Sequence, residues 1–392
     1  MEITRIKAAH SFPIWLPQTQ TWMYNQVKFL PGDVECHIIC ERTENLDQFN
    51  LPNIHSLHKA PKWRSVMDRG LRKLNIRQHV GFMTQQLQKN NIHLLHSHFG
   101  NVGWMNIGAA EQAGVRHVVT FYGRDVIHLP RSDPAWHGRY QKLFAQVDRV
   151  LCEGPHMADC IAGLGCPRET ITVHHLGVEV DKIPFRPRVW DASQPLRVLI
   201  AASFREKKGV PLAIEALGAL RERVPVEVTI IGDADDSAHG AAEKQKILRA
   251  IGEHLPRCNV RMLGYKPHAV FLDEAAVHHV FLSPSLSASD GDTEGGAPVS
   301  IIEAAASGMA IVSTTHCDIP GVVRHGDTGL LAEERDVGGL VKHLMWFAGN
   351  PSAWAKMLEA GRRHIESEFN VAVQGDRLAS HYRAACSPRR TP

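Results

Sequence analysis

The chain alternates short apolar runs with segments of helical spacing from one end of the sequence to the other. Between the runs, 211–223 and 240–255 repeat their apolar residues at the period of a helix. Strands that alternate with helices favour parallel sheets joined by right-handed crossovers. The pattern therefore predicts an α/β fold with doubly wound sheets, with strands at 93–98, 116–121, 148–153, 171–176, 196–202, 226–232, 259–264, 278–284 and 309–314.

A proline-rich stretch without a clear period, IPFRPRVWDASQP at 183–195, separates the two halves of this pattern and is the best linker. We expect one Rossmann-like domain over 1–184 and a second over 185–365. Over 366–392 we expect a C-terminal helix that packs back toward the first domain, followed by a frayed tail. Ligands of doubly wound sheets bind beyond the carboxyl ends of the strands, so the site is expected in a cleft between the two domains.

Composition excludes several classes of protein. Hydrophobic residues make up 44% of the chain and charged residues 22%, which is typical of a globular protein rather than a disordered one. The net charge of +3 is too small to indicate nucleic acid as the main partner. The eight cysteines include no C-x-x-C pair, which favours reduced thiols in a cytoplasmic protein. The sequence shows neither a signal peptide nor an apolar run that could span a membrane.

No metal or other cofactor is expected. The 24 histidines are scattered, and no pair of them has the spacing of an HExxH zinc helix. Asp290-Gly291-Asp292 is interpreted as an acidic loop beside the ligand site rather than as a metal site.

The stretch ASFREKKGV at 202–210 places three cations, Arg205, Lys207 and Lys208, at the carboxyl end of a predicted strand. Guanidinium and ammonium groups in that position suit a phosphate. Taken alone, the stretch is better explained as a solvated basic turn.

The stretch TEGGAPVSIIEAAASG at 293–308 combines a glycine pair, a proline and an apolar helical run. Pro298 suits the first turn of a helix, and Gly295 and Gly296 allow backbone to approach a ligand. The N-terminus of such a helix is a ready anion site. Glu303 lies inside the apolar run, where a carboxylate needs partners that ribose hydroxyls could supply. An exposed helix side is the alternative for Glu303, while Glu294 would face the group beyond the phosphates.

In their order, EKKG, LGY, FLSPS, EGGAPVSIIEAAASG and IPGVVRHGDTGLL resemble the motifs of the retaining, nucleotide-sugar-dependent glycosyltransferases of group 1 (family 4). The resemblance covers nearly the whole chain and is strongest from 196 to 332. It implies a GT-B fold, in which two Rossmann-like domains face a central cleft. The first domain would bind the acceptor, and the second would bind the nucleotide-sugar donor. It implies that Lys208 binds the diphosphate, that Glu303 holds the ribose, and that the donor site is completed by Gly264, Tyr265, Glu294, Gly295, Gly296, Ala297, Pro298 and Val299, with Leu263 beside the base.

The donor motifs depart from the family pattern in two places. Glu294 and Glu303 stand one residue further apart than usual, so Gly296 or Ala297 is expected to bulge out. Ser203 occupies the position of the usual diphosphate arginine. Arg205, offset by two positions, is interpreted as its replacement.

The first half of the chain departs from the family pattern at Tyr122. In Thr120-Phe121-Tyr122-Gly123, Tyr122 stands where the family has a histidine that contacts the transferred sugar. A tyrosine can form that hydrogen bond but cannot become a cation near neutral pH. Arg124 and Asp125 follow directly and could take over contacts.

Two further stretches of the first half suggest acceptor contacts. In HSHFGNVG at 96–103, the side chains of His96 and His98 are expected on opposite faces of a strand, with His98 toward the acceptor beside Gly100. A core or capping histidine is the alternative. The stretch SFPIWLPQTQTW at 11–22 stands where many relatives have a glycine-rich loop after the first strand. It resembles a stretch of exopolysaccharide glycosyltransferases of the colanic acid and amylovoran type, which adds Thr19 and Gln20 to the acceptor side.

Segment 58–78 is basic and amphipathic, with seven Lys or Arg and one Asp. Two interpretations stay open. It could bind an anionic membrane surface, which would suit a lipid-linked acceptor at the inner face of the plasma membrane. The alternative, which is the more common one for such a pattern, is a solvated helix that packs its apolar residues on its own domain.

The resemblance therefore implies a hexosyltransferase that moves sugar from a UDP- or GDP-linked donor to a saccharide acceptor. Its catalytic residues would be Lys208, Arg205, Glu294, Tyr122 and His98. An epimerase or hydrolase of the same fold, or a non-catalytic nucleotide-sugar-binding module, remains open. A dinucleotide-dependent oxidoreductase is disfavoured because no G-x-G-x-x-G follows a strand.

Overall fold

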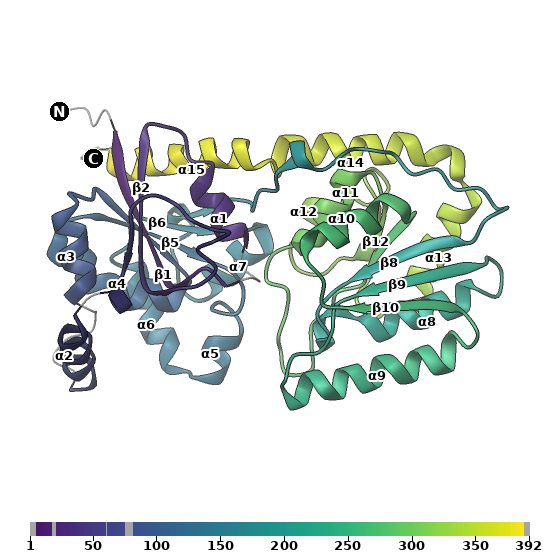
Figure 1. Cartoon of the computed structure of the whole chain (residues 1–392), viewed down its shortest axis with the longest axis horizontal. Coiled ribbons are helices and arrows are strands. Elements are labelled where there is room, and N and C mark those ends of the chain that lie inside the picture. The colour runs from purple at the N-terminus through teal and green to yellow at the C-terminus, as the bar shows by residue number, and fades with distance from the viewer. Residues whose placement is uncertain (1–4, 18–20, 60, 75–80, 388–392) are drawn as a thin grey trace. The chain divides into compact units, whose positions relative to one another are not determined.

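The protein is described by a computed structural model that covers residues 5–17, 21–59, 61–74 and 81–387. The chain divides into two compact units. The first unit contains the residues up to Gly177 together with those from Val371 onward, and the second runs from Val178 to Asn370. Each unit is a parallel sheet with helices on both of its faces, which confirms the predicted doubly wound architecture (Figure 1).

The first unit holds a parallel seven-stranded sheet in the order β3-β2-β1-β4-β5-β6-β7. The four later strands lie within the predicted runs, whereas no residue range was predicted for the first three. Residues 11–15, expected in a loop after the first strand, in fact continue β1. The strands are β1 Ile6–Trp15, β2 Val34–Thr43, β3 Ile54–Ser56, β4 Leu94–His98, β5 Arg116–Phe121, β6 Arg149–Cys152 and β7 Ile171–Val173.

Successive residues of these strands point to opposite faces of the sheet, where different helices cover them. Ala8 and Leu94 pack against the helix α15 (Val371–Cys386), which α1 (Thr21–Lys28) joins on that face. On the other face, the strands pack against α3 and α4. The remaining helices of this unit are α2 Lys62–Lys73, α3 Gly81–Lys89, α4 Gly100–Ala113, α5 His128–Ser132, α6 Ala135–Phe144 and α7 Pro155–Gly163.

The second unit holds a parallel six-stranded sheet in the order β10-β9-β8-β11-β12-β13. The predicted linker at 183–195 contains no helix or strand and lies in this unit. All its strands except β13 were predicted. They are β8 Leu196–Ala201, β9 Val226–Ile231, β10 Asn259–Gly264, β11 Val280–Ser283, β12 Ala310–Thr314 and β13 Leu330–Ala332.

Two sets of helices cover this second sheet. On one face, the core of β8, β9 and β12 packs against α8, α9 and α13, while α10, α11 and α12 cover the other face. α14 contributes side chains to both cores. The helices are α8 Val210–Leu220, α9 Ala238–His254, α10 His268–Val277, α11 Val299–Ser307, α12 Ile319–Val322, α13 Val337–Gly349 and α14 Trp354–Glu368.

In both sheets, the strand order reverses direction once, between β1 and β4 in the first unit and between β8 and β11 in the second. The loops that leave neighbouring strands at such a switch point run in opposite directions and leave room for a ligand at the carboxyl edge. These two edges are therefore where functional side chains are expected.

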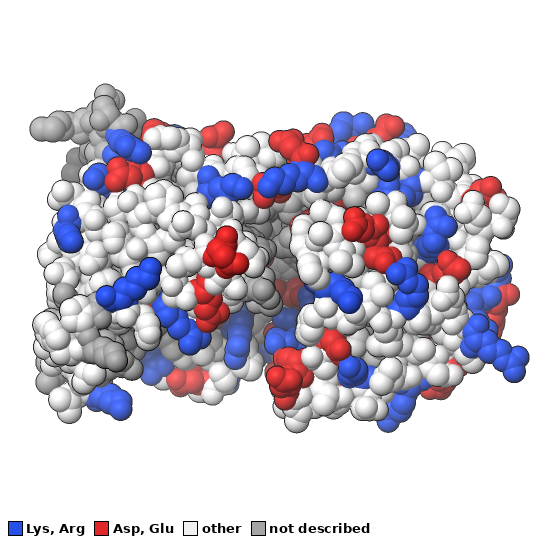
Figure 2. Space-filling model, viewed as in Figure 1, with Lys and Arg blue, Asp and Glu red and all other residues white. Residues whose placement is uncertain are grey.

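Charge is distributed without a dominant sign. Figure 2 shows basic and acidic side chains intermixed over the face in view, in agreement with the net charge of +3. In the described part of the chain, we find no helix with both the length and the apolar character needed to cross a membrane.

Candidate active site

The switch point of the second sheet brings together the two motifs that the sequence singled out. The loop after β8 carries Lys207 and Lys208, and the loop after β11 carries Glu294. The Nζ atom of Lys208 lies 2.7 Å from a carboxylate oxygen of Glu294. The ammonium group of Lys207 donates to the carboxylate of Asp292 at 3.1 Å and to the Thr293 carbonyl at 2.7 Å. The two lysines therefore tie the two loops together.

Glu294 is held as a carboxylate although its side chain is only 6% exposed. Burial raises its pKa, but the charges of Lys208 and Lys207, with the hydrogen bonds from Lys208 and Ser285, outweigh burial and lower it overall. The Ser285 hydroxyl donates to the carboxylate at 2.7 Å. Each carboxylate oxygen has one such partner, and the remaining lone pairs of a buried carboxylate are strong acceptors for ligand hydroxyls.

His316, which follows β12, also supports the loop that carries Glu294. It was not among the site residues predicted from the sequence. Its Nε2 accepts from the backbone N–H of Glu294 at 3.1 Å, so the proton lies on Nδ1, which donates to Glu334 at 2.6 Å. Glu334 in turn accepts from the backbone N–H of Ser287 at 2.8 Å. The signal was available, because His316 stands at the carboxyl end of the strand next to β11.

Gly209 allows the loop after β8 to approach the loop after β11. Its φ of 60° is left-handed, and a Cβ there would lie 2.0 Å from the carbonyl oxygen of Pro284. A Gly209→Ala variant is therefore expected to lose about 2 kcal/mol or more of unfolding free energy in urea titrations. Gly252→Ala is the matched control, because Gly252 lies inside α9 with open space around it. That control should gain about 0.5–1 kcal/mol, and equal losses in both variants would contradict the steric argument.

Glu303 lies in α11 among buried apolar residues, and its side chain is 14% exposed. Its carboxylate accepts from Nε2 of His268 at 2.8 Å, and that hydrogen bond raises the pKa of His268. His268 begins α10 and was not among the predicted site residues. The carboxylate that was predicted to hold ribose therefore already has a partner at the protein surface.

The other donor residues predicted from sequence surround these groups. Arg205 is exposed and pairs with Asp235 at 3.2 Å, and Ser203 is half-buried. Gly264 ends β10, and Tyr265 beyond it is 60% exposed. Gly295 adopts a φ of 77°, Gly296 beside it is buried, and Ala297, Pro298 and Val299 lead half-buried into α11.

In the first unit, the structure joins two of the predicted residues directly. Nδ1 of His98, at the end of β4, lies 2.6 Å from the hydroxyl of Tyr122, just after β5. Burial raises the pKa of Tyr122 well above its ordinary value, so its hydroxyl keeps its proton. The prediction that His96 and His98 face opposite sides is wrong. Their rings stack at 4.2 Å between centroids, because residues two apart in a strand share a face.

Asp125 anchors the turn that carries Tyr122. Its two oxygens accept from the backbone N–H groups of Gly100 at 2.7 Å and of Tyr122 at 3.0 Å. Burial raises the pKa of Asp125 to about 6. Arg124 is exposed, while Thr19 and Gln20 lie outside the described residues. The geometry thus gives Asp125 a structural task in addition to the contact predicted for it.

These observations define the class of protein. It is a parallel α/β protein in which paired lysines and carboxylates lie at the switch point of a sheet. The family model described as glycosyl transferases group 1 matches residues 185–364, and that described as glycosyltransferase family 4 matches residues 19–182. The amylovoran biosynthesis glycosyltransferase AmsK of Erwinia amylovora is 34% identical over 294 residues, which cover 72% of this chain and 68% of AmsK. WcaL of Escherichia coli, named for colanic acid biosynthesis, is 33% identical over the same shares.

Solved structures agree in fold. HepE of Anabaena, crystallised with UDP, superposes with a TM-score of 0.77 at 15% identity, over 97% of this chain and 100% of HepE. Sucrose-phosphate synthase from Thermosynechococcus elongatus superposes with a TM-score of 0.73 at 17% identity, over 97% and 99% of the two chains. The chain belongs to the group 1 (family 4) glycosyltransferases, and its two parallel-sheet domains have the GT-B fold.

Proposed function

We propose that the protein transfers a hexosyl unit, with retention of configuration, from a UDP- or GDP-linked sugar to a saccharide acceptor in exopolysaccharide or cell-surface polysaccharide synthesis. The observation that carries the proposal is the Lys208–Glu294 pair at the switch point of the second sheet. AmsK and WcaL, named for exopolysaccharide synthesis, and the UDP in the HepE crystal support it.

In the proposed reaction, the bond between the anomeric carbon and the diphosphate oxygen breaks, and the acceptor oxygen bonds to that carbon on the same face. The acceptor proton passes to the leaving phosphate oxygen. Lys208 and the N-terminus of α11 stabilise the diphosphate charge without a metal, joined by Arg205 once it leaves Asp235. Glu294 binds sugar hydroxyls and Glu303 the ribose.

The test is incubation of the purified protein with UDP-, GDP- and ADP-linked sugars, with and without saccharide acceptors. Release of nucleoside diphosphate and a lengthened saccharide only when an acceptor is present is the expected result. Free sugar or an epimer formed from donor alone would identify a hydrolase or epimerase instead. Nucleotide binding without turnover would identify a binding module.

We further propose that the protein works in the cytoplasm, at the inner face of the plasma membrane, on a lipid-linked acceptor. Four apolar residues of segment 58–78 are exposed to solvent. Trp63, Val66, Met67 and Leu74 are 66%, 65%, 48% and 70% exposed. Because the segment also carries seven Lys or Arg and one Asp, its chemistry fits an anionic lipid surface.

A variant with Trp63, Val66 and Met67 all changed to serine is expected to bind vesicles containing phosphatidylglycerol about tenfold more weakly than the native chain in flotation assays. The matched control changes Val189, Leu248 and Val277, which are exposed apolar residues of the second unit. Equal vesicle binding by native chain and first variant would contradict the proposal, as would equal binding to uncharged phosphatidylcholine.

A further inference from the structure

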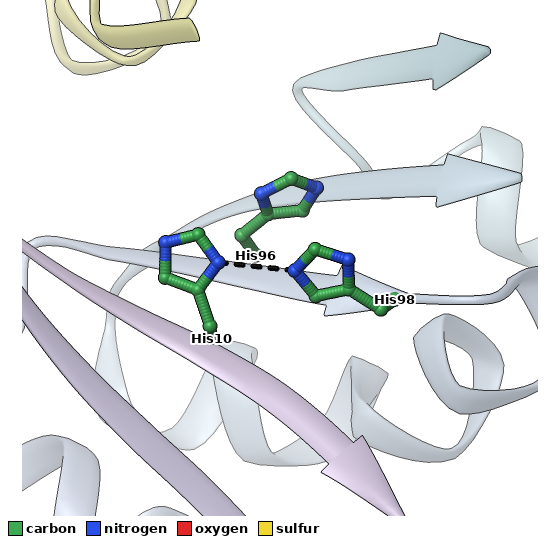
Figure 3. Close-up of side chains that lie close together, drawn as sticks. All are labelled: His10, His96 and His98. Atoms are coloured by element: carbon green, nitrogen blue, oxygen red, sulfur yellow. Dashed lines mark hydrogen bonds between the residues drawn. The ribbon is translucent and has the colours of Figure 1, made fainter. Parts of the chain in front are cut away.

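Buried histidines lie near the carboxyl edges of both sheets. In the first unit, His10 on β1 stands beside His96 and His98 on β4 (Figure 3). Their ring nitrogens are all hydrogen-bonded, to one another or to the hydroxyls of Thr120, Tyr122 and Tyr382. This cluster therefore satisfies its own polar groups inside the first sheet.

The three histidines offer nitrogens within 4.8 Å of one another, a spacing that would admit a metal ion. Their rings do not converge on one point, however. Nδ1 of His10 and Nε2 of His98 face each other at 3.0 Å, and the two rings lie in line, as the dashed bond in Figure 3 shows. The His96 ring is stacked on that of His98 at 4.2 Å between centroids. A metal needs lone pairs that meet about 2 Å from each nitrogen, so this geometry favours a hydrogen-bonded cluster.

The buried His316 of the second unit differs, because its hydrogen bonds lead to the candidate active site. Its side chain is 1% exposed. Nε2 accepts from the backbone N–H of Glu294 at 3.1 Å, and Nδ1 donates to Glu334 at 2.6 Å. Lys208 and Ser285 hold the carboxylate of Glu294, whereas His316 holds its backbone. His316 thus fixes the point from which the Glu294 side chain starts.

Glu334, which follows β13, holds the other end of the same loop. Its carboxylate accepts from the backbone N–H of Ser287 at 2.8 Å and from the Ser287 hydroxyl at 3.2 Å. Burial raises the pKa of Glu334, but the hydrogen bonds from Ser287 and His316 outweigh burial and lower it overall. One carboxylate therefore ties down Ser287 directly and Glu294 through His316.

The residues between these two ends form a turn with contacts of its own. The backbone N–H of Ala288 donates to the carbonyl of Asp292 at 2.9 Å. Lys207 donates to the Asp292 carboxylate and to the Thr293 carbonyl. Segment 287–294 is thus anchored from three neighbouring loops, those that follow β8, β12 and β13. A change at His316 or Glu334 removes two of these anchors and leaves Lys207 and Lys208 in place.

We propose that His316 and Glu334 act as one hydrogen-bonded unit that positions Glu294 against the sugar of the donor, without touching the substrate themselves. That Glu294 meets a sugar rests on the proposed function; the hydrogen-bonded unit does not. Glu294 also competes with a diphosphate for Lys208. A loosened Glu294 is therefore expected to weaken recognition of the sugar but not binding of the nucleoside diphosphate.

The hydrogen-bonded unit is tested in the full chain without substrate. Nitrogen-15 NMR at pH 7.5 should show His316 as the neutral Nδ1–H tautomer, with its signals identified by their loss in His316→Gln. The backbone N–H of Glu294 should exchange with solvent about tenfold faster in His316→Gln and in Glu334→Gln than in the native chain. The opposite tautomer, an imidazolium, or native exchange in either variant would overturn the proposal.

His325→Gln is the matched control for these variants. Nδ1 of His325 also accepts from a backbone N–H, that of Leu331 at 3.0 Å, but His325 belongs to the turn before β13. Exchange at Glu294 should stay native in this control. Equal acceleration in all three variants would show a general loss of stability and would overturn the positioning role.

The effect on the reaction is read as a split between two ligands. In His316→Gln and Glu334→Gln, kcat/KM for the nucleotide sugar should fall about tenfold or more, because a small displacement of a group beside the reacting sugar is costly. The Kd of UDP or GDP, whichever nucleotide the donor carries, should stay within about threefold of the native value. Equal weakening of nucleotide sugar and nucleotide would overturn the proposal.

A double variant tests whether the two residues act through one path. The combined loss in kcat/KM should lie within about threefold of the larger single loss, since either change already breaks the path. Independent losses that multiply would overturn the single unit. If the native chain turns over no nucleotide sugar, the proposed function fails, and the tautomer and the exchange of Glu294 still decide whether the unit exists.

Discussion

A Lys208→Ala variant is expected to lose sugar transfer by about 100-fold or more in kcat/KM, the cost of removing one preorganised charge from a developing anion. Lys208 is the cation paired with the buried Glu294 at the switch point, where the leaving diphosphate is proposed to sit. The loss is measured as release of nucleoside diphosphate at saturating acceptor. The variant should also raise the pKa of Glu294, since the charge of Lys208 is the largest influence that lowers it.

Two companion variants define the role of Lys208. Lys356→Ala removes an exposed lysine from α14 and should keep native activity. Lys208→Arg keeps the charge and should recover part of the loss. Transfer by Lys208→Ala within about threefold of the native rate would remove Lys208 from the mechanism, because that difference is worth less than 1 kcal/mol.

Acid is expected to unfold the first unit before the second. Five of its described histidines are buried and keep a pKa far below the 6.5 of an unfolded chain, mainly because burial disfavours their charged form; they are His10, His96, His98, His117 and His174. Unfolding lets each take up a proton below pH 6.5, so the stability they provide is present above that pH and falls as the pH drops. With five such groups, the free energy of unfolding changes by about 7 kcal/mol per pH unit. This change would cancel the stability of an ordinary domain near pH 5.

His174→Leu isolates one of these groups. Among the described residues, neither ring nitrogen of His174 has a hydrogen-bond partner, although the side chain is buried. The free energy of unfolding of the variant should be about 1–3 kcal/mol higher at pH 7. Its dependence on pH should correspond to the uptake of one proton fewer on unfolding. Urea titrations between pH 5 and 8, with hydrogen exchange to assign the unit, provide the measurement. Loss of the second unit first, or an unchanged slope, would contradict the assignment.

The fold was predictable because parallel strands buried on both faces appear as short apolar runs, which is how β8 to β12 were found. The range of β1 was not predicted, because its sequence, IKAAHSFPIW, places the polar residues His10 and Ser11 inside the strand. Those polar residues are buried only because partners from β4 and α4 reach them. No local pattern in the sequence predicts such partners.

The residues of the candidate site likewise include some that the sequence predicts and others that only the structure shows. Lys208 and Glu294 lie in motifs that the sequence displays, and the structure places them in contact. His316 and His268 lack a motif, and their positions depend on which strand ends meet. The link from His10 through Tyr382 to His96 joins residues from both ends of the first unit and could not be anticipated without the topology.

The ion pair between Lys208 and Glu294 also has a consequence for selectivity among anions. A bare phosphate or sulfate that binds Lys208 removes from the buried Glu294 the cation with the largest effect on its charge, so the exchange gains little. A ligand that brings hydroxyl groups together with its phosphate supplies a new partner to each side of the broken pair. On the proposed function, we therefore expect the Lys208–Glu294 pair to bind a molecule that carries phosphate and hydroxyl groups together more tightly than phosphate or sulfate alone.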